Sequence, residues 1–195
     1  MSTKRRVVLS AGVVGLLAAL IGASWAAFSS TTSNPNNVFA AGTVNIGDND
    51  AGSYMYNVSN QKPGTPVTKC IKVTYTGSLP ATVKLYASAV GALGNYVNLT
   101  ITPGTGNPTF PDCTGFTPDS GGALYTGTLK GFTDTYTNYD NGLADNPGTT
   151  ATNWATNDAV VYQFALTLQD DNSANGGATP LSTGLHSFTW EARNQ

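Results

Sequence analysis

The sequence predicts an all-β protein, an antiparallel β-sandwich of the jelly-roll type preceded by a cleavable signal peptide. Three observations lead to this prediction. Beyond residue 30, apolar side chains recur at every second position in short runs, separated by clusters of glycine, proline, asparagine and aspartate. No apolar stripe with helical spacing interrupts these runs. The chain also begins with a basic cluster followed by a long uncharged segment, which is typical of export signals.

Residues 1–26 are predicted to be the signal peptide. Three consecutive cations occupy positions 4–6, and the following segment to residue 28 carries no charge. The small residues Ser24 and Ala26 suit the −3 and −1 positions, which places cleavage between Ala26 and Ala27. An uncleaved anchor is the alternative, because an uncharged stretch of this length could span a bilayer.

The first half of the remaining domain, predicted over residues 38–195, contains three runs with strand periodicity. Residues 38–46 alternate between two sets of small or apolar side chains. Residues 54–58 place two tyrosines and a valine on one face and end before the Lys-Pro-Gly turn at 62–64. Residues 67–75 place valine, isoleucine and tyrosine on one face and threonine, lysine and Cys70 on the other.

The second half supplies the remaining strands. Residues 83–87 follow the Gly-Ser-Leu-Pro break, and residues 97–101 repeat the same alternation. Residues 160–168 give the clearest pattern, with five large apolar side chains on one side. The last strand is predicted over residues 185–192. Long loops are expected at about 103–121 and 130–156, and seven or eight short strands of this kind favour a sandwich.

The two cysteines of the chain are Cys70 and Cys113. In an exported protein a single cysteine pair forms a disulfide by default, so we expect these two to be bonded. Because Cys70 lies on the polar face of its strand and Cys113 lies in the 103–121 loop, the bond would hold that loop against the outside of a sheet.

Composition excludes several classes of function. Only 10% of the residues are charged, the net charge is −2, and there is no basic run, so nucleic-acid binding is not expected. A zinc peptidase of the common type needs two histidines one helical turn apart, whereas this chain has only His186. No local motif supports a Ser–His–Asp triad. We therefore expect no catalytic residues, no resident metal and no cofactor.

Two polar or aromatic features have alternative interpretations. The acidic stretches 48–50, 140–145 and 170–172 carry oxygen ligands that suit calcium, but the same residues are common turn formers. The aromatic residues of the loop-rich middle could stack on sugar rings, face a neighbouring subunit or cap the core. These residues are Tyr125, Tyr136, Tyr139 and Trp154.

Four segments, in this order, carry a resemblance to a known family: GASWAAFSS at the end of the signal peptide, NVFAAGTVNI at 37–46, KPGTPVTKCIKVTYTGSL at 62–79 and FTWEARN at 188–194. Together they resemble the TasA/camelysin family of exported proteins. The resemblance implies a jelly-roll fold and a secreted, extracellular or cell-surface location. It also implies processing by a signal peptidase and assembly into homo-oligomeric fibres of a biofilm matrix. Camelysin itself has been classed as a metalloprotease.

The resemblance further implies that residues 27–37 act as a donor strand that enters the next subunit. This segment is uncharged, and Phe28 is its one large apolar side chain, so Phe28 is the expected anchor. Pro35 fits a hinge, because proline cannot donate a ladder hydrogen bond. A frayed N-terminus is the alternative. The predicted donor residues are Ala27, Phe28, Ser29, Ser30 and Pro35.

The predicted function is therefore that of a secreted structural subunit that self-assembles by donor-strand exchange. Its partners would be further copies of itself, the signal peptidase during export, and a component of the cell surface or matrix. A monomeric secreted sandwich that binds a glycan or another surface ligand is the alternative. A camelysin-type metalloprotease is a more distant one.

Overall fold

The structure is a computed structural model that describes residues 32, 37–148, 150–175 and 180–194. The chain divides into two units, residues 1–40 and 41–195. The predicted signal peptide, its cleavage site at Ala26 and Ala27, and the donor residues Phe28, Ser29, Ser30 and Pro35 lie outside the described residues. Within the described part of the chain, no helix is long and apolar enough to cross a membrane.

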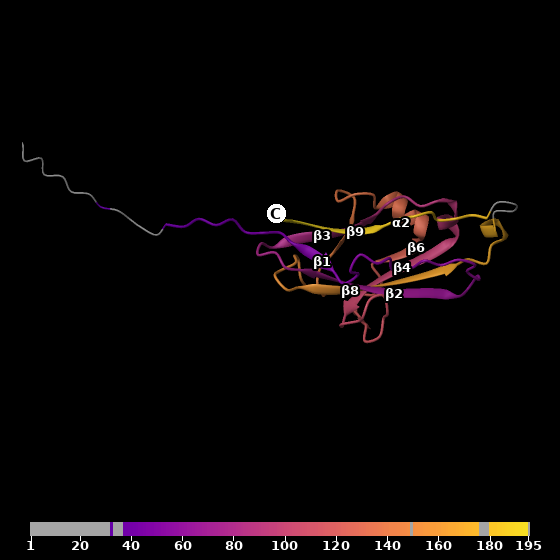
Figure 1. Ribbon diagram of the computed structural model, residues 1–195, viewed down its shortest axis with the longest axis horizontal. Helices are drawn as coiled ribbons and strands as arrows, with labels where there is room; N and C mark the ends of the chain where they lie inside the picture. Colours follow the sequence, from indigo (N-terminus) through magenta and orange to yellow (C-terminus); the bar gives the residue numbers. More distant parts are fainter. Residues whose placement is uncertain (1–31, 33–36, 149, 176–179, 195) are drawn as a thin grey trace, which may run out of the picture. The chain divides into compact units, whose positions relative to one another are not determined.

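The second unit is an antiparallel β-sandwich (Figure 1). Among the described residues, the larger sheet has six strands. Five of them follow the order β1 (Ile46–Asp48), β2 (Pro66–Tyr75), β8 (Ala159–Leu168), β4 (Val97–Thr105) and β5 (Thr117–Pro118). The sixth, β6 (Tyr125–Thr128), pairs with β4 on the same side as β5. The smaller sheet has the order β7 (Leu143–Asp145), β3 (Ala81–Ala87) and β9 (Phe188–Asn194). The predicted all-β sandwich class is confirmed.

The centre of the larger sheet is the ladder formed by β2, β8 and β4. Ile71 lies opposite Tyr162, and Ile101 lies opposite Phe164. These strands are rich in valine, isoleucine and aromatic residues, which suit a pleated surface with a buried face. The chain passes from one sheet to the other between β2 and β3, β3 and β4, β6 and β7, β7 and β8, and β8 and β9. The two inner faces therefore enclose one core.

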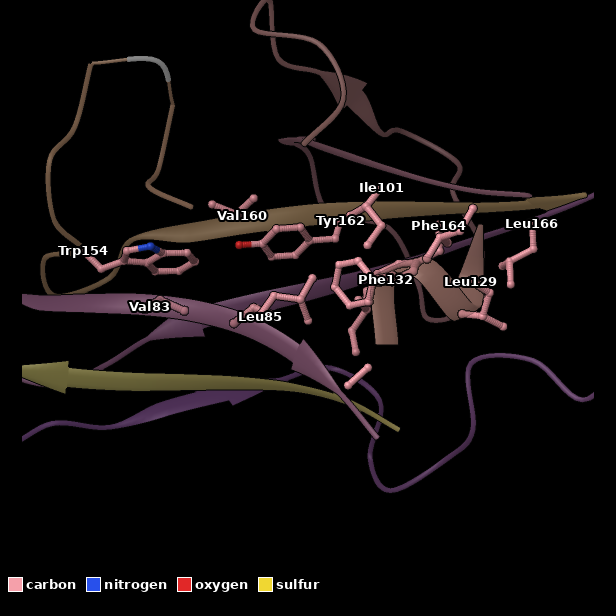
Figure 2. Packing of buried hydrophobic residues seen from close by; sticks show 14 of the residues in the cluster. Val83, Leu85, Ile101, Leu129, Phe132, Trp154, Val160, Tyr162, Phe164 and Leu166 are labelled. Carbon is pink, nitrogen blue, oxygen red and sulfur yellow. The ribbon is translucent and has the colours of Figure 1, made fainter. Parts of the chain in front are cut away.

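The core lies between the sheets and combines aliphatic side chains with five large aromatic ones (Figure 2). Val83 and Leu85 project from β3 toward Val160 and Tyr162 of β8. The largest fully buried side chains are Trp154, Tyr75, Tyr162, Phe132 and Phe164. Trp154 comes from the predicted 130–156 loop and closes one end of the core, since its backbone pairs with Ala81.

A short helix, α2 (Leu129–Thr135), lies where the sequence predicted none. Thr128 caps its N-terminus, since its Oγ1 accepts a hydrogen bond of 3.0 Å from the backbone N–H of Gly131. Phe132 of this helix is buried in the core. Seven residues are too few to show an apolar stripe over several turns, which explains the wrong prediction. Two 3₁₀ turns, η1 (Ala92–Tyr96) and η2 (Asn172–Asn175), complete the helical elements described.

The N-terminal strand predictions are also corrected. Of the run at 38–46, only Ile46 joins a sheet, where it pairs with Tyr75. The carbonyls of Asn45 and Thr43 still accept hydrogen bonds from the backbone of residues 76–79, but each carbonyl accepts from two successive N–H groups, so a regular ladder does not continue. Residues 54–58 form no strand. In the first unit, Val38 and Phe39 are 89% and 99% exposed. The last strand begins at Phe188 rather than at residue 185.

Candidate functional site

An open groove of about 770 Å³ is bounded by both sheets and by two irregular segments. Its floor is apolar, because it is formed by inward-facing side chains of three strands. These are Val67 and Ile71 of β2, Leu166 and Leu168 of β8, and Phe188 and Trp190 of β9. Its walls are residues 53–58, between β1 and β2, and residues 182–187, before β9. A hollow with this lining favours an apolar ligand or an extended peptide.

The strand β9 runs along this groove as the outer strand of the smaller sheet. Within the described residues it is hydrogen-bonded only to β3, from Ala81↔Asn194 to Ala87↔Phe188. On its other side lies β1, which contacts β9 but pairs with β2, and residues of both strands line a second hollow of about 180 Å³. A seven-residue edge beside an apolar groove is the geometry that accepts an added strand.

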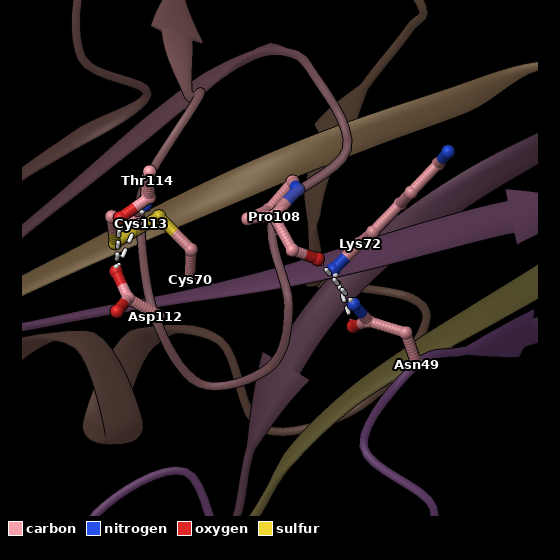
Figure 3. The surroundings of a disulfide bond; sticks show 7 residues. All are labelled: Asn49, Cys70, Lys72, Pro108, Asp112, Cys113 and Thr114. Carbon is pink, nitrogen blue, oxygen red and sulfur yellow. Dashed lines mark hydrogen bonds between the residues drawn. A yellow bond between two sulfur atoms is a disulfide. The ribbon is translucent and has the colours of Figure 1, made fainter.

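The edge of β2 differs from that of β9, because a loop covers it (Figure 3). The backbone N–H of Cys70 donates to the carbonyl of Pro111 at 3.1 Å. Cys70 is fully buried and forms a disulfide with Cys113, in the same loop. The bond therefore holds the loop against the sheet at the strand position where the sequence placed it.

One further contact closes this edge (Figure 3). Asn49 accepts a 2.9 Å hydrogen bond from the backbone N–H of Lys72 through its Oδ1 and donates from its Nδ2 to the carbonyl of Pro108 at 3.2 Å. Two outward-facing amides of β2 are thus occupied by groups other than a strand. Covering an edge in this way prevents a foreign strand from pairing there.

The two walls of the groove meet at Tyr56 and His186. The Tyr56 hydroxyl donates to Nε2 of His186 at 2.5 Å, while Nδ1 of His186 donates to the carbonyl of Gly184 at 3.0 Å. Because a carbonyl oxygen can only accept, Nδ1 is assigned as the donor to Gly184 and Nε2 as the acceptor from the Tyr56 hydroxyl. Burial raises the pKa of Tyr56 far above its ordinary range, so its hydroxyl remains a donor. His186 also contacts Phe188 edge to face, with ring centroids 6.0 Å apart.

These residues do not fit a catalytic zinc site. Such a site needs three protein ligands and an open position. Both ring nitrogens of His186 already have protein partners. Among the described residues, no group of three or more histidine, cysteine, aspartate or glutamate side chains is placed to hold a metal ion.

The acidic stretch at 48–50 serves as a turn. The carboxyl group of Asp48 accepts from the backbone N–H of Asp50, and that of Asp50 accepts from Gly52. Burial is the main cause that raises the pKa of Asp48, with the nearby Asp50 carboxyl group contributing. Such local hydrogen bonds are typical of aspartate-rich turns. They explain why aspartate and glycine occur in this stretch without requiring a bound cation.

Most aromatic residues of the middle region belong to the core rather than to a sugar-binding surface. Trp154 is fully buried. Tyr125 and Tyr136 pack against Phe132, with ring centroids 5.0 and 4.9 Å from it. Tyr139 lies under the Arg193 guanidinium at 4.0 Å. Of the three interpretations of these residues, capping of the core is the one that these contacts favour.

One polar cluster is enclosed between the sheets. Oδ2 of Asp145, the hydroxyl of Tyr162 and Nε1 of Trp190 are all buried, and none meets hydrogen-bond geometry with a described residue. The Asp145 carboxyl group and the Tyr162 hydroxyl are nevertheless close enough to perturb each other. Burial raises the pKa of Asp145 from 3.8 to about 6, against the opposing effect of the Tyr162 hydroxyl.

Sequence reasoning missed the groove walls. The sequence predicts strands over residues 54–58 and 185–192, whereas residues 53–58 and 182–187 are the irregular walls of the groove. The alternation predicts that Tyr54 and Tyr56 share one face of a strand. In the structure Tyr56 packs against the core, whereas Tyr54 is 74% exposed. The pairing of Tyr56 with His186, which are 130 residues apart, has no local signal.

A known protein family matches the N-terminal part of the chain. Residues 2–90 match the family model of the camelysin metallo-endopeptidases. No curated protein matches the chain. The matched range contains the first three of the four segments that carry the resemblance, together with β1, β2 and β3, whereas the fourth segment, at 188–194, lies outside it. The resemblance to the TasA/camelysin family is therefore confirmed over residues 2–90 of the chain.

Proposed function

We propose that this protein is an exported structural subunit that assembles into extracellular fibres or a surface matrix. In this proposal, residues 27–37 of one copy add as a strand to the β9 edge of the next copy and seat Phe28 in its groove. The observation that supports it most is the apolar groove lying along the unpaired edge of β9. Cleavage before Ala27 would release the donor, and the proposed location is secreted or at the cell surface.

The two partners of the proposed contact are chemically matched. The donor segment carries no charge, and the groove floor is formed mainly by aliphatic and aromatic side chains. Val38 and Phe39, which directly follow the segment, are both almost fully exposed and available for a contact with a second copy. Because the edge of β2 is covered by the disulfide-bonded loop, strand addition would be directed to β9.

A structural role agrees better with the site than a peptidase role does. The single histidine of the chain uses both ring nitrogens within the protein, so it offers no free metal ligand. The proposal therefore includes neither a metal nor a catalytic residue. Peptidase activity that a chelator abolishes and that His186→Ala removes would contradict this part of it.

Two chain lengths test the assembly. The chain starting at Ala27 should form filaments visible by electron microscopy and should scatter light, whereas the chain starting at Val38 should remain monomeric. Phe28→Ala in the longer chain should slow or abolish filament growth, and Ser29→Ala is the matched control that should not. Monomers from both lengths would refute the proposal, and glycan binding by those monomers would instead support the alternative of a binding module.

A further inference from the structure

The wall formed by residues 53–58, called the strap here, is attached to the sandwich by side chains. Met55 and Tyr56 pack against the core, whereas Tyr54 and Val58 are 74% and 45% exposed. Among the described residues, no backbone–backbone hydrogen bond joins residues 54–60 to either sheet. A segment with few backbone hydrogen bonds opens at low free energy compared with the strands around it.

The strongest polar attachment of the strap is the contact between Tyr56 and His186. The hydroxyl is held at 2.5 Å from Nε2, and the rings lie with their centroids 5.6 Å apart. The imidazole is itself fixed, because Nδ1 bonds to the carbonyl of Gly184 in the opposite wall. This one contact therefore joins the two walls of the groove above the floor formed by β2, β8 and β9.

We propose that the Tyr56–His186 contact is a latch that keeps the strap on the groove, and that it must open before a donated strand can enter. The gating part of this inference rests on the proposed function, in which the entering strand is residues 27–37 of a second copy. In the unassembled chain, the latch narrows the entrance to the apolar floor. Once the strap is released, the floor and the neighbouring edge of β9 become accessible together.

The size of the effect follows from the single hydrogen bond. A protein hydrogen bond of this kind contributes a net amount of about 1 kcal/mol. Because a factor of ten corresponds to about 1.4 kcal/mol, its loss should raise the open population about fivefold. Tyr56→Phe removes the hydroxyl and keeps the ring in the core. Tyr54→Phe is the matched control, since Tyr54 is exposed and belongs to the same strap.

The first measurement is the population of the open strap in dilute, unassembled protein. It is read by NMR relaxation dispersion of the Met55 methyl group, which packs against the core in the closed strap. Tyr56→Phe should raise the open population about fivefold over that of the natural chain, and Tyr54→Phe should leave it unchanged. His186→Leu, which removes the acceptor, should reproduce the effect of Tyr56→Phe. Equal open populations in all variants would show that the contact does not hold the strap, and this result does not depend on whether the protein forms fibres.

The second measurement is the lag time of assembly, followed by light scattering. Tyr56→Phe should shorten the lag by a similar factor, and the control should not. A larger open population with an unchanged lag would overturn the gating role while leaving fibre formation intact. If the natural chain forms no fibres at all, the proposed function fails, and the relaxation measurement still decides whether the latch exists.

Discussion

Asp145 is an acidic group that folding removes from water, and its replacement gives a quantitative test of the buried polar cluster. It lies in β7 opposite Val83 of β3, and its Oδ2 is buried near the hydroxyl of Tyr162. Burial raises its pKa from 3.8 to about 6, and the more distant Asp119 adds to the increase. In the unfolded chain the Asp145 carboxyl group is exposed to water, so it has its ordinary pKa of 3.8.

The sign of the effect follows from the direction of this change. Below about pH 4 the carboxyl group is protonated in both states, so burial carries no ionisation cost. As the pH rises from about 4 to about 6, the unfolded state loses its proton first, and the folded state becomes less stable relative to it. The gap between 3.8 and about 6 corresponds to about 3 kcal/mol. Because the carboxyl group is not fully enclosed, we expect its ionisation to lower the free energy of unfolding by between about 1 and 3 kcal/mol.

The variant Asp145→Asn should therefore be more stable than the natural protein by that amount at pH 7 and nearly equal to it at pH 3.5. Urea unfolding across this pH range measures the difference. Asp140→Asn is the matched control, because it removes the same charge from a side chain that is 92% exposed. A stability difference that is independent of pH, or one of equal size in the control, would refute the account of the burial of Asp145.

The other predictions concern the disulfide, the β2 edge and the core. Replacing both Cys70 and Cys113 by serine opens a loop with a sequence separation of 43, and should lower the free energy of unfolding by up to about 4 kcal/mol in a denaturant titration. Asn49→Ala should increase the hydrogen-exchange rate of the Lys72 amide, whose acceptor it removes, and unchanged exchange would argue against the covered edge. Phe164→Ala should lower the free energy of unfolding by about 3 to 5 kcal/mol in the same titration, since Phe164 is fully buried. A decrease of less than about 1 kcal/mol would contradict its place in the core.

The long central strands could be predicted from the sequence because their side-chain pattern follows directly from the pleat. In β3, residues that alternate in the sequence also alternate in burial, and in β2 the disulfide-bonded Cys70 is the exception to this alternation, so the pattern indicates both the strand and its inner face. The short elements could not be predicted in this way. β1 has three residues and α2 has seven, and each depends on neighbours far away in the sequence that it packs against.

The candidate site was less predictable than the fold. The sequence contains two cysteines, so the disulfide could be predicted once the protein was expected to be exported into an oxidising compartment. The groove depends on two irregular segments lying at a distance from each other in the chain, and no periodicity describes them. His186 has two hydrogen-bond partners in the structure, and one of them, Tyr56, follows only from the three-dimensional structure.

The location of the donated strand in an assembled fibre tests the central claim most directly. An electron cryo-microscopy map of filaments grown from the chain that starts at Ala27 would show it. We predict that residues 27–37 of each subunit lie beside β9 of the next subunit, with Phe28 above the groove floor. Filaments in which this segment pairs within its own subunit, or in which the β9 edge has no added strand, would contradict the account.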